Sequence, residues 1–201
     1  LSSVAALILT TASFIVSPVS TASEMTFRQL HRVSVPEAHQ AVAVDASSFY
    51  AISNRTIGRY EKGTSRPLSK WTAPDGSPVI HLNSGIVVEG RLYCANSNWP
   101  KSPLKNSIEI FSAETLEHLE RKEFDETEGA INWIQRHRGS WWIAFAFYGE
   151  ANVRRTYLVR YDNEWRKTGT WTFPESVIER FLPNSNSGGA FGPNGRLFVT
   201  G

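Results

Sequence analysis

The stretch that decides the fold is residues 39–52, HQAVAVDASSFYAI, in which polar residues, an apolar strand, a tight turn and an aromatic strand follow one another. The same phrase returns about every 45 to 55 residues along the chain. The later copies are residues 83–88 with 92–95, 130–134 with 141–145, and 189–191 with 197–199. Repeats of this length, each built from four short strands, are typical of a β-propeller.

The remaining strands complete this pattern. A third strand is expected in each repeat at residues 56–60, 107–111 and 157–161, and a more charged fourth strand at residues 68–72, 119–124 and 165–173. The sequence therefore predicts an all-β protein, a propeller of four-stranded antiparallel blades. Residues 27–201 hold about three and a half blades, so we expect an incomplete fragment of a propeller, truncated at its C-terminus, with one short helix at residues 174–181.

Composition limits the partners. Apolar residues make up 41% of the 201 residues and charged residues 20%, as in ordinary globular proteins, and the formal net charge is only +2. A charge this small, without a Lys and Arg cluster, argues against nucleic acid or an anionic membrane as a partner. The one cysteine, Cys94, cannot form an internal disulfide and is expected in the core.

The N-terminal segment differs from the rest. An apolar run at residues 4–16 is followed by Pro18 and by the small residues Ser20, Thr21 and Ala22, the pattern of a secretory signal peptide. The run is shorter than the about 18 to 20 residues that span a bilayer. We therefore expect a signal peptide at residues 1–22 and a secreted or periplasmic protein, with an N-terminal membrane anchor as the alternative. Because the chain begins with Leu1, upstream residues are expected to be missing.

Polar residues stand where the innermost strand of each blade begins. These strand starts converge near the central channel of a propeller, so their side chains are candidates for a ligand site there. The candidates are His39, Gln40, His81, Asn83, Ser84, Glu128, Asn132, Asn186 and Ser187. Imidazole, carboxylate and amide groups around one axis bind a small polar ligand or a divalent cation, for which His39, His81 and Glu128 are the candidate ligands. Alternatively, these side chains satisfy backbone groups and trapped water.

Aromatic residues offer a second kind of site. Most tryptophans lie within strands, where packing between blades explains them: Trp71, Trp133, Trp141, Trp142 and Trp171. Trp99 and Tyr148 instead flank loops, where their rings would stack on a sugar or another flat ligand. The sequence contains no Gly-x-Ser-x-Gly, His-Glu-x-x-His or Cys-x-x-Cys motif that would identify a known catalytic centre.

Several phrases together carry a resemblance to a known group of proteins. They are His39–Asp45, Phe49–Asn54, His81–Gly85, Leu92–Asn98 and Ser187–Gly192. These phrases resemble secreted, mostly bacterial propeller proteins of undefined activity. More distantly, the layout is similar to gluconolactonase-type and glutaminyl-cyclase-type propellers, a resemblance that implies a cation or substrate at the channel. The Glu and Asp ligands that define those enzymes have no assigned counterpart here.

Three functions are compatible with these observations. The first is a secreted binding module whose channel mouth holds a small polar molecule or an ion. The second is a metal-assisted hydrolase, lactonase or cyclase that acts at the same mouth, with a divalent cation as Lewis acid. The third is a scaffold for protein partners. An enzyme needs a carboxylate or imidazole within reach of a metal-bound water, whereas a binding module needs only donors and acceptors.

Overall fold

The structure, a computed structural model, describes residues 28–125 and 129–201. The chain divides into two compact units, residues 1–32 and residues 33–201. Residues 28–32 of the first unit contain neither helix nor strand. The expected signal peptide, residues 1–22, and the candidate ligand Glu128 lie outside the described residues.

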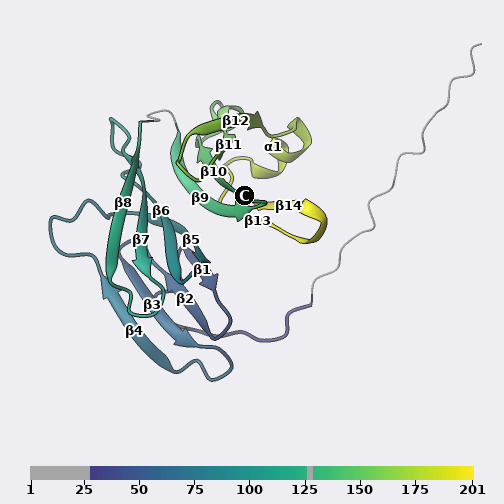
Figure 1. Cartoon of the computed structure of the whole chain (residues 1–201). Helices are drawn as coiled ribbons and strands as arrows, with labels where there is room; N and C mark the ends of the chain where they lie inside the picture. Colours follow the sequence, from purple (N-terminus) through teal and green to yellow (C-terminus); the bar gives the residue numbers. More distant parts are fainter. Residues whose placement is uncertain (1–27, 126–128) are drawn as a thin grey trace, which may run out of the picture. The chain divides into compact units, whose positions relative to one another are not determined.

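The second unit consists of three four-stranded antiparallel sheets and one two-stranded sheet (Figure 1). Blade 1 comprises β1 (Ala41–Val44), β2 (Ser48–Ile52), β3 (Thr56–Glu61) and β4 (Pro67–Thr72). Blade 2 comprises β5 (Leu82–Val88), β6 (Arg91–Ser97), β7 (Asn106–Ser112) and β8 (His118–Phe124). Blade 3 comprises β9 (Ala130–His137), β10 (Ser140–Ala146), β11 (Tyr157–Tyr161) and β12 (Lys167–Thr172). The last sheet pairs β13 (Gly188–Phe191) with β14 (Leu197–Thr200).

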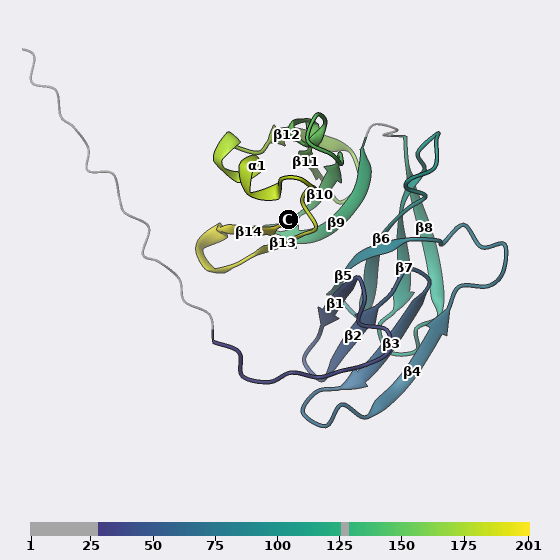
Figure 2. The same ribbon diagram turned by 180° about the vertical axis from the view of Figure 1, so that it is seen from behind.

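Within each blade the strands pair in chain order, so every blade is a simple antiparallel meander. The view from behind shows the same succession of sheets (Figure 2). The helical elements are short: α1 (Glu175–Phe181) and the 3₁₀ turns η1 (Val153–Arg155) and η2 (Pro193–Gly195). The helix expected at residues 174–181 is thus confirmed, with Pro174 just before its first residue.

In each complete blade, a short turn connects the first strand to the second. Glu89–Gly90 and Arg138–Gly139 have positive φ at both residues, the geometry of a type I′ turn. Blade 1 has no glycine at this place. There the Asp45 carboxylate accepts backbone hydrogen bonds from Ser47 (2.8 Å) and Ser48 (2.6 Å), which close the turn in another way.

The core lies between consecutive blades. One cluster joins blade 1 to blade 2 and includes Tyr50, Ile52, Ile57, Leu92, Cys94 and Phe111. A second joins blade 2 to blade 3 and includes Ile108, Ile110, Ile134, Trp141 and Ile143. Cys94 is completely buried, which confirms its predicted place in the core. The innermost strands of consecutive blades lie next to one another, because β1 contacts β5, β5 contacts β9, and β9 contacts β13.

The strand tryptophans only partly follow the prediction that they pack between blades. Trp133 and Trp141 are buried in the interblade clusters, with 1% and 6% of their surface exposed. Trp171 is 42% exposed, so the prediction was wrong for this residue. It lies on β12, the outer strand of blade 3, and outer strands bury the least surface in every blade.

The predicted fold class is confirmed: the described chain is nearly all-β and has the antiparallel four-stranded blades of a propeller. None of its helices has the length and apolar character that crossing a membrane requires, within residues 28–125 and 129–201.

Candidate ligand site at the loop face

One end of the blades collects most of the candidate residues. Because the strands alternate in direction, the first and third strands of each blade begin at this end, and the second and fourth strands end there. The connections at residues 53–55, 98–105 and 147–156 therefore share this end, together with the starts of β1, β5, β9 and β13. We call this end of the blades the loop face.

The polar residues of blade 2 bind the first strand of blade 3. The Asn83 side-chain amide donates to the Ile131 carbonyl (2.9 Å), and the Ser84 hydroxyl accepts from the Ile134 amide (3.2 Å). Asn106, which was not predicted as a site residue, accepts from the Ile131 amide (2.8 Å) through its side-chain oxygen. These side chains are buried, so their hydrogen bonds to backbone groups hold the two blades in register.

Asn132 and Asn186 play the same part between blade 3 and the last hairpin. The Asn132 amide donates to the Asn186 carbonyl and also lies 3.3 Å from the Tyr148 hydroxyl. The Asn186 side chain accepts from the Trp133 indole and donates to the Thr200 carbonyl (2.9 Å). Both residues are buried, and their side chains hydrogen-bond across the contact between blade 3 and the last hairpin.

The other candidates are dispersed over the loop face. Gln40 is exposed and donates to Asn54 (2.7 Å) within its own blade, and Ser187 is exposed beside Thr200 (3.2 Å). His39 is exposed. His81 is half-buried, with its ring 6.3 Å from the ring of Trp99.

The predicted cation site depends on a residue outside the described part of the chain. Across residues 28–125 and 129–201, no three His, Cys, Asp or Glu side chains lie close enough to hold a metal ion. His39 and His81 thus belong to no described cluster, and Glu128 is not described. The assignment of His39, His81 and Glu128 as cation ligands stays a prediction.

The loop face instead brings together aromatic rings from two blades. Trp99, from the loop that follows β6, and Tyr148, from the loop that follows β10, have ring centroids 4.7 Å apart. Trp99 is 40% exposed, while burial raises the pKa of the Tyr148 hydroxyl above its ordinary value. The His81 ring lies edge to face with Trp99, at 6.3 Å between ring centroids, so Trp99 has a ring neighbour in each of the two blades.

A pocket of about 240 Å³ lies against these rings. Its lining residues come from both loops and from the start of β9: Trp99, Leu104, Gly129, Ala130, Ala146, Phe147, Tyr148 and Arg155. The Arg155 guanidinium lies 4.2 Å from the Phe147 ring centre, a cation–π contact that places a positive charge at the pocket. The pocket thus combines flat apolar rings with a phenol hydroxyl and a guanidinium.

Both loops are held by their own side chains. Asn98 donates to the Pro103 carbonyl (2.9 Å) and accepts from the Lys105 amide (2.7 Å), which closes the first loop across its base. In the second loop, the Thr156 hydroxyl accepts from the Phe147 amide (3.1 Å). These bonds hold the two loops in a defined arrangement against the blades.

Sequence reasoning identified only part of this pocket. It singled out Trp99 and Tyr148 as loop aromatics, but it missed Leu104, Phe147 and Arg155. The available signal was the length of the loops at residues 98–105 and 147–156, which are longer than residues 53–55 of blade 1. Long loops on a rigid scaffold are where binding residues concentrate.

Comparison with known proteins supports the fold and nothing finer. No family model matches the sequence, and no curated protein matches it either. The structure is similar to hydrazine synthase of Kuenenia stuttgartiensis, with a TM-score of 0.53 and 12% identity over 79% of this chain and 42% of that one. This likeness, at 12% identity, supports a propeller-like fold for the chain and nothing about its activity.

Two further solved structures show weaker likeness. A neuraminidase-like protein from A/bat/Guatemala/164/2009 has a TM-score of 0.43 and 13% identity over 64% of this chain and 36% of that chain. The extracellular domain of a hybrid two component system from B. thetaiotaomicron has a TM-score of 0.46 and 14% identity over 85% of this chain. The present chain spans 42%, 36% and 21% of the lengths of these three structures.

Proposed function

We propose that this chain is part of an exported β-propeller that binds a small polar ligand with a flat face, such as a sugar, at the loop face. The observation that carries the proposal is the Trp99–Tyr148 ring pair, contributed by loops of two neighbouring blades beside a pocket. Aromatic rings that remain partly exposed, on loops fixed by side-chain hydrogen bonds, are typical of sites that stack on a ligand.

The polar groups beside the rings support the same proposal. The Tyr148 hydroxyl offers a donor and an acceptor, and the Arg155 guanidinium adds donors. The pocket of about 240 Å³ lies below the about 300 to 1,000 Å³ usual for drug-sized molecules, so its ligand would be of monosaccharide size. The signal-like residues 4–16 and 20–22 support export, and the resemblance to secreted propellers of undefined activity agrees with it.

Binding is proposed ahead of catalysis because the polar groups already have defined structural partners. The side-chain N–H groups of Asn83, Asn132 and Asn186 donate to backbone carbonyls, which gives these residues a structural role. The metal-assisted alternative rests on His39, His81 and Glu128, and metal analysis of the purified protein would test it directly.

The binding proposal is tested with glucose and glucuronate as probes in titration calorimetry. We expect saturable binding of at least one of these probes, and a loss of at least tenfold in affinity for Trp99→Ala. The matched control is Trp171→Ala, because Trp171 is equally exposed, 42% against 40%, but lies on an outer strand. Equal affinity in the two variants, or no binding by either probe, would contradict the proposal.

A further inference from the structure

The three complete blades can be superposed residue by residue through their strand pairing. Each has an irregularity at the same place near the turn between its third and fourth strands, after Arg59, Ile110 and Arg160. In each blade, the residue two positions before the start of the fourth strand has a φ of about 60°. These residues are Ser65, Leu116 and Trp165. The turn therefore repeats in all three blades, and equivalent positions can be assigned.

The outer strand carries one position at which the blades differ in chemistry. Trp71 pairs with Ile57 in blade 1, Lys122 pairs with Ile108 in blade 2, and Trp171 pairs with Leu158 in blade 3. Each of these pairs is the third residue pair before the register irregularity of its blade, so the three positions are equivalent. A lysine in blade 2 thus takes the place of a tryptophan in the blades before and after it.

Between blades 1 and 2 the tryptophan packs against blade 2. The Trp71 ring lies 4.7 Å from the Phe111 ring in an edge-to-face contact and 6.4 Å from the His118 ring, nearly parallel to it. Trp71 also contacts the buried cluster that joins the two blades. At this interface, the groove between outer strands is occupied by an indole from the protein itself.

Between blades 2 and 3 the equivalent groove is hollow. Tyr161 and Lys167 pair with each other in blade 3 as Phe111 and His118 do in blade 2. Lys122 does not fill the space, and a hollow of about 380 Å³ remains, lined by Lys122, Glu123, Phe124, Asp125, Tyr161, Trp165 and Lys167. We call it the outer groove. Its volume lies within the about 300 to 1,000 Å³ of small-molecule sites.

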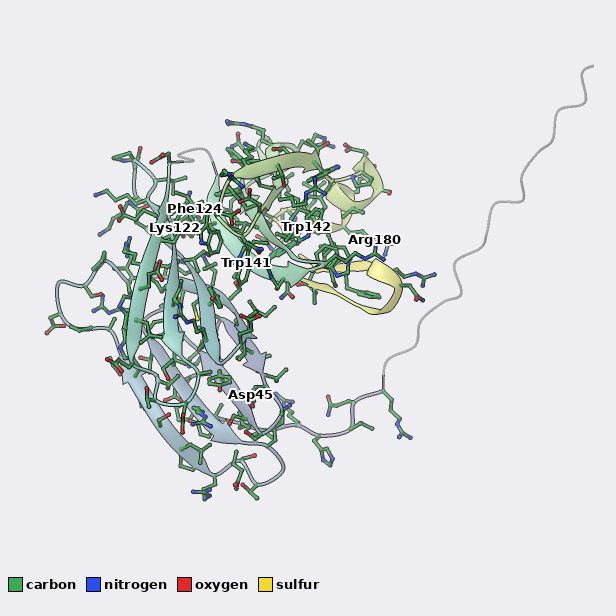
Figure 3. The ribbon with its side chains drawn as sticks, in the orientation of Figure 1. Asp45, Lys122, Phe124, Trp141, Trp142 and Arg180 are labelled. Carbon is green, nitrogen blue, oxygen red and sulfur yellow. The ribbon has the colours of Figure 1, made fainter. Side chains whose placement is uncertain are left out.

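Aromatic rings form the floor of the outer groove. Phe124 meets Tyr161 (5.4 Å) and Trp165 (5.8 Å) edge to face. Trp165 in turn stacks on Trp141, with the ring centres 5.1 Å apart and the planes 11° from parallel. Figure 3 shows Lys122, Phe124 and Trp141 together where β8 meets blade 3. These stacked rings leave the groove a rigid apolar surface.

Two ammonium groups at the groove offer contacts to an anionic group. Within the described residues, the side chains of Lys122 and Lys167 form no ion pair. Glu123 shares Arg121 (3.0 Å) with the buried Glu109 (2.6 Å), and Asp125 adds a second carboxylate at the end of β8, so the charges at the groove balance but the two lysines have no carboxylate partner. A negatively charged group would reach both lysines while a ring rests on the aromatic floor.

We propose that the outer groove binds a small planar aromatic molecule that carries a carboxylate, its ring taking the place that Trp71 occupies between blades 1 and 2. The ring packs against Tyr161, Trp165 and Phe124, and the carboxylate pairs with Lys122 and Lys167. The site is separate from the loop-face pocket, with which it shares no lining residue.

Titration calorimetry with indole-3-acetate, indole and tryptamine tests the proposal on the full chain. We expect indole-3-acetate to bind at least tenfold more tightly than tryptamine, because only the first carries an anion. Binding of tryptamine as tight as that of indole-3-acetate would overturn the proposal. So would the absence of saturation by indole-3-acetate at about 10 mM, where a ligand of millimolar affinity saturates.

Two variants locate the binding. Lys122→Trp fills the groove with the residue of blade 1 and should abolish binding, while Lys122→Met keeps the volume open, removes the charge and should weaken binding about tenfold. Trp99→Ala, which alters only the loop-face pocket, should leave it unchanged. If Lys122→Trp does not fold, the Lys122→Met and Lys167→Met variants decide, and wild-type affinity in both would overturn the proposal.

Discussion

The interface between blades 1 and 2 differs from the interface between blades 2 and 3, although strands at equivalent positions form both. The first is closed at its outer end by Trp71 and contains a buried carboxylate, Glu109. The second has stacked aromatic rings, Trp141 and Trp165, but its outer end stays open, with a hollow beside Lys122. The blades share one backbone arrangement, but the outer end of an interface is filled or hollow according to the side chain at a single position, Trp71 or Lys122.

The buried carboxylate illustrates the sealed interface. Glu109 is fully buried, and it binds Arg121 (2.6 Å), the Ser107 hydroxyl (2.6 Å) and the His118 ring (2.8 Å). Its strand position is taken by Gly58 in blade 1 and Val159 in blade 3, so only blade 2 carries this cluster. A charge out of water needs such a complete set of partners, because each unmet partner costs free energy.

The largest predicted effect comes from Glu109→Gln. The amide keeps part of the hydrogen bonding but leaves the Arg121 guanidinium with only the exposed Glu123 (3.0 Å) as counter-charge, so we expect the free energy of unfolding to fall by about 3 to 4 kcal/mol. Urea unfolding followed by circular dichroism measures this. The control is Glu120→Gln, since Glu120 is exposed and 3.9 Å from Arg91. A loss no larger than that of the control would show that the cluster is not important for stability.

Trp71→Ala opens the closed interface. Because Trp71 is half-buried against Phe111, we expect a loss of about 2 kcal/mol in the free energy of unfolding. Trp171→Ala, at the equivalent position of blade 3 but more exposed, should cost less than half as much. If the two variants lose the same free energy of unfolding, measured with denaturant, Trp71 does not stabilise its interface more than Trp171 stabilises blade 3.

Lys122→Trp closes the open interface. The new ring would cover Tyr161 and Trp165 as Trp71 covers Phe111, and we expect a gain of about 1 kcal/mol and a higher Tm. Lys122→Leu, which adds less apolar area, should gain less. A decrease in Tm for Lys122→Trp, measured by differential scanning calorimetry, would mean that the groove cannot accept an indole.

The smallest predicted effect is a dependence on pH at the first interface. The Tyr50 hydroxyl lies between the Asp45 carboxylate (2.5 Å) and the Ala113 carbonyl of blade 2 (2.8 Å). Burial on its own raises the pKa of Asp45, but the hydrogen bonds from Tyr50, Ser48 and Ser47 outweigh it and lower the pKa below its ordinary value. Burial and the nearby Asp45 carboxylate raise the pKa of Tyr50.

A lowered carboxyl pKa means that ionised Asp45 stabilises the folded state above about pH 4, and that this stabilisation is lost as the pH falls through the folded-state pKa. We therefore expect the free energy of unfolding of Asp45→Asn to depend less on pH below about pH 4 than that of the wild type. Asp75→Asn, in an exposed loop, is the control. The measurement is urea unfolding at a series of acid pH values, and identical slopes for Asp45→Asn and wild type would contradict the assignment.

The fold could be predicted from the sequence because each blade is a local structure. Strand alternation, the Glu89–Gly90 and Arg138–Gly139 turns and the repeat length are all read from residues close together in the chain. The polar strand starts were also visible. Their partners were not, because Asn83 and Asn132 bind backbone groups about 50 residues away, in the next blade.

The outer groove shows the same division between sequence and structure. The sequence by itself determined the blades, their order, and the presence of Lys122 in an outer strand. Only the tertiary structure decided that this lysine stands where Trp71 and Trp171 stand in their blades, and that a hollow lies beside it. The physical reason is that strand pairing depends on local backbone geometry, whereas a cavity depends on side chains that meet only when separate sheets pack together.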